Sequence, residues 1–193
     1  MSRLVIPIPL VFLVVLAPAP AAPIPKHLPQ VPAGYYPTKV GTKLVYDRKG
    51  VAETRLVTKV EKADGGTMVT TANVAPDGTQ SPHMKVLVNE KGLFLAEEHG
   101  SAYDSPWCIF QPPLKPGNTW DTIVLRNRNE ILRGRMTAVK EEKIKTPAGE
   151  FTTGRVDWEI PQSQLTVSYW YAPQVGLVRQ GELVLKSFTL GRD

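Results

Sequence analysis

The 193-residue sequence is poor in the residue types that most often carry chemistry. It contains one cysteine, Cys108, so no disulfide can form within the chain. Its three histidines do not stand at metal-ligand spacings, and the chain has no Gly-x-Ser-x-Gly sequence and no glycine-rich phosphate loop. We therefore expect no metal, no cofactor and no catalytic residue, and a protein that is not an enzyme.

Two local patterns have structural explanations. Cys108 lies in the apolar run Trp107–Phe110 without an adjacent basic residue, which is typical of a buried, unreactive thiol. Glu97, Glu98 and His99 are expected to form an acidic strand end that faces water.

Charge of one sign and long apolar runs are both scarce. The chain carries 23 basic and 18 acidic residues. Without residues 1–21 it loses one arginine and no acid, so 22 basic and 18 acidic residues leave a net charge of +4. This excess is mild for a nucleic-acid-binding protein, and we expect no nucleic-acid partner.

The first 21 residues are typical of an export signal. Arg3 precedes an apolar segment from Leu4 to Leu16, and small residues follow, with cleavage favoured after Ala21. The apolar segment is shorter than the roughly 20 residues that span a bilayer. The sequence thus predicts a signal peptide at 1–21, export to the periplasm or the medium, and no stable transmembrane segment after cleavage.

Proline is concentrated at the start of the chain. Nine of the 18 prolines lie in the first 37 residues, and residues 22–34 lack a periodic apolar pattern. This composition favours an extended, proline-rich tether. Residues 35–193 are then expected to form a single β domain.

Alternation with period two dominates that domain. In the clearest strand, Val156, Trp158 and Ile160 alternate with charged residues, and Leu56, Thr58 and Val60 are expected to share the apolar face of another strand. Turn sequences recur about every ten residues, so the strands should follow one another as hairpins. We expect an all-β fold: a strongly curved antiparallel meander sheet (half-barrel or open barrel) of about ten strands with little helix. Only Ser101–Phe110 suggests a short helical turn or an irregular crossover.

One weak repeat is visible. Pro37–Leu44 and Pro113–Trp120 both place proline, lysine and glycine before a strand with a large apolar residue. Either two strands begin with the same turn, or half of the sheet is duplicated.

Three motifs together resemble a known group of proteins. They are Tyr35–Thr42, Lys145–Phe151 and Tyr169–Val178. In order and spacing they are similar to a broad group of exported bacterial all-β proteins of mostly unknown function, and the resemblance covers Tyr35 to about Leu190. It implies an architecture similar to the half-barrel of periplasmic lipoprotein carriers (the LolA and LolB type), around an apolar cavity. It implies no catalytic residue, because the motifs are turns and strand ends.

The apolar face is the first candidate site. A sheet with one apolar face and no helix to cover it can enclose a cavity for a lipid-like or other hydrophobic ligand, or for a segment of a partner. The ligand-binding residues expected on this face are Leu132, Met136, Val156, Trp158 and Ile160.

The second candidate site is on the surface. The segment 126–145 carries seven basic and three acidic residues, which equals the net excess of the chain after cleavage, and Trp170 lies on an otherwise polar strand face. Charges that solvate and protect a sheet edge would explain the segment; docking to an envelope protein or an anionic surface is the functional alternative. That alternative predicts an envelope interaction protein without a ligand cavity. Its contact residues would be Trp170, Arg126, Arg128, Arg133 and Arg135.

Overall fold

Twelve antiparallel strands form one sheet in the computed structural model, which describes residues 32–191. The predicted signal peptide and residues 22–31 of the predicted tether lie outside the described residues. The strands are β1 (Lys43–Arg48), β2 (Val51–Ala63), β3 (Gly66–Val74), β4 (Gln80–Asn89), β5 (Gly92–Glu98), β6 (Ser101–Phe110), β7 (Thr119–Arg126), β8 (Asn129–Thr146), β9 (Gly149–Ile160), β10 (Leu165–Ala172), β11 (Gly176–Gln180) and β12 (Leu183–Thr189).

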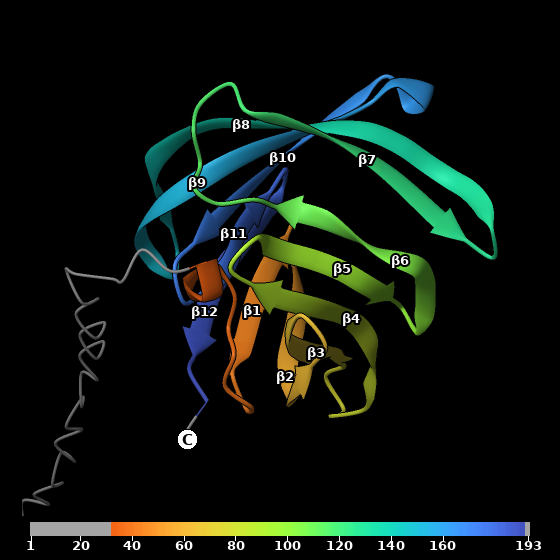
Figure 1. The fold of residues 1–193 in the computed structure, drawn as a ribbon. Coiled ribbons are helices and arrows are strands. Elements are labelled where there is room, and N and C mark those ends of the chain that lie inside the picture. Colours follow the sequence, from red (N-terminus) through yellow and green to blue (C-terminus); the bar gives the residue numbers. More distant parts are fainter. Residues whose placement is uncertain (1–31, 192–193) are drawn as a thin grey trace, which may run out of the picture.

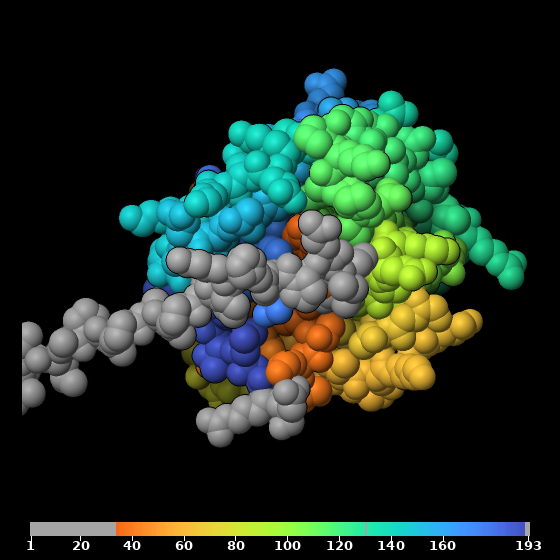
Figure 2. Space-filling model, turned by 60° about the vertical axis from the view of Figure 1, so that its left-hand side comes forward, coloured from red at the N-terminus to blue at the C-terminus, as the bar shows by residue number. Residues whose placement is uncertain are grey.

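The sheet is a meander whose first and last strands pair with each other. Its order is β6-β5-β4-β3-β2-β1-β12-β11-β10-β9-β8-β7, so every neighbour except the β1–β12 pair is consecutive in sequence. Figure 1 shows the strands wrapping into a nearly closed barrel shape. In the space-filling view the orange first strand lies beside the blue last strand (Figure 2). The predicted all-β, strongly curved antiparallel meander is confirmed, with twelve strands instead of about ten.

The prediction for Ser101–Phe110 was wrong, because this segment is strand β6. It pairs with β5 through two irregularities, at Leu93/Phe94 and at Leu95/Glu97. Each bulge moves the following side chains to the other face, so the period-two pattern that marks a strand is lost.

The two edge strands, β6 and β7, are joined by side chains. Trp120 Nε1 donates to the carbonyl oxygen of Cys108 at 3.1 Å. The carboxylate of Asp104 accepts the backbone N–H groups of Asn127 and Arg128 at 2.9 and 2.6 Å. The barrel shape therefore closes without a β6–β7 ladder among the described residues.

The weak sequence repeat corresponds to two turns with the same hydrogen bonds. Gly41 N–H donates to Val57, which donates back to Thr42. Gly117 N–H donates to Ala138, which donates back to Asn118. Both glycines have a positive φ, and a bulge follows each partner residue. The two segments are therefore alike in the turn that opens them and in the neighbouring strand to which that turn is hydrogen-bonded.

Helix is almost absent from the described part of the chain. Residues 32–191 contain two short 3₁₀ turns, η1 (Pro32–Tyr35) and η2 (Pro161–Ser163). No helix within this range has the length and apolar character that a membrane crossing requires. The interior is therefore filled by strand side chains alone.

Two apolar clusters form the core. One joins β2–β6 to β8–β10, and the other joins β1 to β9–β12 and the loop before β11. Their largest fully buried side chains include Tyr46, Phe110, Met136, Leu183 and Leu185. Between these packed clusters the curved sheet encloses a cavity.

Candidate ligand-binding cavity

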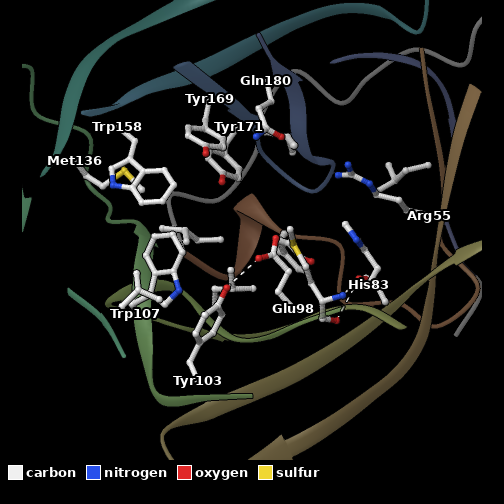
Figure 3. Close-up of a pocket in the computed structure, with 18 of the residues that line it drawn as sticks. Arg55, His83, Glu98, Tyr103, Trp107, Met136, Trp158, Tyr169, Tyr171 and Gln180 are labelled. Carbon is white, nitrogen blue, oxygen red and sulfur yellow. Dashed lines mark hydrogen bonds between the residues drawn. The ribbon is translucent and has the colours of Figure 1, made fainter. Parts of the chain in front are cut away.

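A cavity of about 420 Å³ lies inside the curved sheet, within the usual range of ligand pockets of roughly 300–1,000 Å³. Figure 3 shows part of its lining. Strands β1 to β11 all contribute side chains, so the cavity depends on closure of the whole sheet. Its aliphatic, proline and methionine lining consists of Pro37, Leu44, Met84, Leu95, Ile109, Val124, Ile131, Leu132, Met136, Val175 and Leu177.

Three of the five residues predicted on the apolar face line this cavity: Leu132, Met136 and Trp158. Trp158 is held in place, because its Nε1 donates to the hydroxyl of Thr122 at 3.0 Å. Gly134 leaves room for the indole, since a Cβ there would collide with Trp158 Nε1. The absence of a side chain at Gly134 thereby allows the Trp158 indole to take its place in the cavity wall.

The other two predicted residues, Val156 and Ile160, are buried in the core instead. They flank Trp158 on the same face of β9. The lining includes Trp158 and neither neighbour, so Trp158 is the part of β9 that reaches the cavity.

Aromatic rings form another part of the wall. Trp107 lies 5.1 Å from Trp158 between ring centroids, and Tyr169 is stacked near Tyr171 at 6.4 Å. Burial raises the pKa of Tyr169 to about 12 and raises the pKa of Tyr171 well above its usual value, so both phenols are neutral near pH 7. Rings of this kind present large apolar surfaces together with a hydroxyl at the edge.

Arg55 and His83 form a polar part of the lining, on β2 and β4. Both are more than nine-tenths buried, and neither Arg55 Nε nor His83 Nδ1 has a hydrogen-bond partner. Burial first, and then the positive charge of Arg55 and the nearby His99, lower the pKa of His83 to about 3. The imidazole of His83 is therefore neutral near pH 7.

Glu98, Tyr103 and Arg126 form a second polar group in the lining. Tyr103 donates from its hydroxyl to Glu98 Oε2 at 2.9 Å, and the Arg126 guanidinium lies 4.7 Å above the Tyr103 ring. Burial first, and then Glu98, raise the pKa of Tyr103 to about 12. The prediction that Glu98 faces water was wrong, because Glu98 lines the cavity. The neighbouring Glu97 forms an ion pair with the half-exposed Lys85 at 2.7 Å.

The predicted surface arginines are not all at the surface. Arg126 lines the cavity, whereas Arg128, Arg133 and Arg135 are exposed. Arg135 pairs with Asp121 at 2.9 Å. The basic segment also contains the pairs Lys140–Glu142 and Lys143–Glu150, so part of its charge is already matched within the chain.

Trp170 is half-buried on the outer face and has partners on three sides. Its ring lies between the guanidinium groups of Arg155 and Arg179, at 5.3 and 5.2 Å, and its Nε1 donates to Glu142 at 2.8 Å. Arg155 in turn pairs with Asp157. These contacts explain an aromatic residue on a polar face without an external partner.

Sequence reasoning missed the polar part of the lining because of a bulge in β2. Thr58 is an extra residue between two register positions, so Arg55 and Val57 face inward before it and Val60 after it. The expected face of Leu56, Thr58 and Val60 was therefore wrong for its first two members. A buried arginine was hidden among residues that alternation assigned to solvent.

The described residues contain no group of three or more His, Cys, Asp or Glu side chains that could hold a metal ion. Burial raises the pKa of the Cys108 thiol to about 11, and Cys108 Sγ lies 3.5 Å from the carbonyl oxygen of Phe110. Cys108 is half-buried instead of fully buried, and its low reactivity stays a prediction.

Comparison with known proteins shows the fold. No protein-family model matches the sequence, and no curated protein matches it significantly. A crystal structure from Bacteroides fragilis, described as a "putative exported protein with YmcC-like fold", is similar with a TM-score of 0.52 and 17% identity. A second, a "putative lipoprotein" from Parabacteroides distasonis, has a TM-score of 0.46 and 24% identity. Each comparison covers 80% of this chain and 98% of the other.

Proposed function

We propose that this protein is an exported, non-catalytic binding protein whose cavity holds a lipid-like or other hydrophobic ligand. The observation that carries the proposal is the cavity of about 420 Å³ in an otherwise close-packed interior. Protein interiors rarely leave voids larger than a water molecule. A large void surrounded mostly by aliphatic and aromatic side chains is costly to maintain and suits an apolar guest.

Export is part of the proposal and rests on residues 1–21, which have the charged, apolar and small-residue regions of a signal peptide. The Bacteroides fragilis protein with the similar fold is itself described as exported. The site of action would be the periplasm or the medium.

The alternative, an envelope interaction protein that uses Trp170 and the basic segment, is less well supported. It expects an interior without a cavity, whereas a cavity of about 420 Å³ lies inside the sheet. Trp170 and several of the basic side chains are already engaged within the chain. We therefore favour the cavity as the functional site.

A neutral fluorescent probe tests the proposal. N-phenyl-1-naphthylamine, which is apolar and uncharged at neutral pH, should bind the delipidated protein with increased emission at one saturable site. In Leu132→Trp the added indole would occupy the cavity, and binding should fall at least ten-fold. Thr152→Trp on the exposed face of β9 is the matched control and should bind as wild type does. Failure of wild type to bind, or equal binding by Leu132→Trp, would count against the cavity as the site.

A further inference from the structure

We infer that the ligand is a single-chain amphiphile with one carboxylate, and that this carboxylate binds at the end of the cavity where Arg55 and His83 lie. The inference rests on the proposed function, because it names the ligand class for that same cavity. It is carried by the hydrogen-bonding groups of the lining and by their charge.

Unsatisfied nitrogen atoms are concentrated in the cavity. Among the described residues, four buried side-chain nitrogens lack a hydrogen-bond partner, and all four belong to lining residues: Arg55, His83, Trp107 and Arg126. Trp107 Nε1 lies near the Tyr103 hydroxyl but without hydrogen-bond geometry. Buried donors are nearly always paired in folded proteins, since an unpaired one costs about 1–3 kcal/mol. Three of the four are N–H donors in every protonation state, which suits a ligand that accepts hydrogen bonds.

Arg55 has little compensation for its charge. Its one carboxylate partner is Glu53, at 3.5 Å from Nη2, and Glu53 makes a much shorter contact of 2.6 Å with Arg48. The guanidinium otherwise lies 4.5 Å above the ring of Tyr46. A buried guanidinium whose one carboxylate contact is long and shared with Arg48 is only partly compensated, and a second carboxylate is a partner that fits its planar fork.

His83 adds a second donor at the same end. Its ring is close enough to Arg55 to feel that charge, and it is neutral near pH 7. A neutral imidazole carries one N–H, so with the hydrogen on Nδ1 it can donate to the carboxylate that Arg55 binds. The pair would thereby supply one charged and one neutral donor.

The charges of the lining favour a single negative charge on the ligand. Two arginines, Arg55 and Arg126, and one acid, Glu98, line the cavity, so the lining carries a net charge of +1. A carboxylate balances this charge, whereas a doubly charged phosphate monoester would leave a buried negative excess.

The end of the cavity opposite Arg55 and His83 is apolar and suits the tail of the proposed ligand. In Figure 3, Arg55 and His83 lie on one side, whereas Met136 and Trp158 lie on the opposite side. Trp107 packs against Trp158 there. An elongated molecule with one acidic end and one apolar end matches this division.

Isothermal titration with three twelve-carbon probes tests the inference on the delipidated, exported protein. We expect dodecanoate to bind more tightly than dodecanol by on the order of 10- to 100-fold, the effect of one charge-assisted pair, and more tightly than dodecyl phosphate. Arg55→Met should lower dodecanoate affinity to that of dodecanol and leave dodecanol binding unchanged. Lys62→Met removes an exposed charge from the same strand and should change neither.

The outcomes separate the two proposals. Equal affinity of wild type for dodecanoate and dodecanol would overturn the acidic head group and leave the hydrophobic ligand in place. Tighter binding of dodecyl phosphate would overturn the carboxylate. Binding of none of the three would contradict the proposed function itself. The wild-type comparison needs no variant. If Arg55→Met fails to fold, His83→Leu removes the second donor at the same end of the cavity and should weaken dodecanoate binding without weakening dodecanol binding.

Discussion

The side chains of Arg55 and His83, from strands β2 and β4, lie at the same end of one cavity, and each has a buried nitrogen without a partner. They are not neighbours in the sheet, because β3 lies between their strands. The curvature of the sheet brings them together over a space that the apolar core does not fill. Both the proposed ligand and the acid sensitivity expected from His83 depend on this arrangement.

The neutral state of His83 predicts a loss of stability in acid. Its pKa falls on folding from the ordinary value of 6.5 to about 3, so below pH 6.5 the unfolded chain binds a proton that the folded chain does not. The free energy of unfolding should therefore fall from about pH 6.5 to about pH 3, by up to about 1.4 kcal/mol per pH unit. His83→Leu removes this contribution.

Urea unfolding at about pH 7.5 and about pH 5 measures the difference. His99→Asn is the matched control, because His99 is exposed, and asparagine tolerates its positive φ. Equal losses between the two pH values in wild type and His83→Leu would show that His83 is protonated in the folded protein.

Gly134→Ala should disturb the Trp158 wall. The new Cβ would collide with Trp158 Nε1 and lie 2.6 Å from the Glu159 carbonyl oxygen. We expect a destabilisation of about 1–3 kcal/mol and a shift of tryptophan emission. Thr122→Val, which removes only the hydrogen bond to Trp158, should cost less. A Gly134→Ala protein with wild-type stability and emission would show that the indole has room to move.

Cys108 should resist thiol reagents. Burial raises its pKa to about 11, so almost no thiolate forms near pH 8. Ellman's reagent should react slowly with the native protein and at once in denaturant. An exposed thiol introduced as Thr152→Cys on β9 provides the comparison. Equal native rates at the two positions would mean that β5, β6 and β7 open readily around Cys108.

Trp170→Leu separates structural from functional roles of the outer face. The variant loses the contacts with Arg155 and Arg179 and the hydrogen bond to Glu142, so stability should fall by about 1–2 kcal/mol. Binding of N-phenyl-1-naphthylamine should be unchanged, since Trp170 lies outside the cavity. Loss of probe binding at full stability would give the outer face a functional role.

Local sequence patterns were enough to predict most of the architecture. Alternation in Val156, Trp158 and Ile160 identified β9, and the turn around Pro147 joined it correctly to β8. These are short-range signals, because each strand reports its own apolar face and each turn its own backbone conformation.

The polar lining of the cavity could not be predicted in this way. The bulge at Thr58 reverses the faces of β2 and turns Arg55 inward, and nothing in the local pattern marks the extra residue. Arg126 was also predicted to lie on the surface. Its inward position depends on the approach of strands β6 and β7, which are linked by the hydrogen bond from Trp120 to Cys108. Long-range closure decides which polar residues share a cavity.

Native mass spectrometry of the exported protein tests the central claim most directly. The full chain, including the predicted signal peptide at residues 1–21, would be expressed in an exporting host and purified without detergent. The account predicts a reproducible adduct at one molecule per chain that extracts into organic solvent, absent from Leu132→Trp and present in the exposed-face control Thr152→Trp. A bare mass for wild type, together with no uptake of added dodecanoate or N-phenyl-1-naphthylamine, would contradict it.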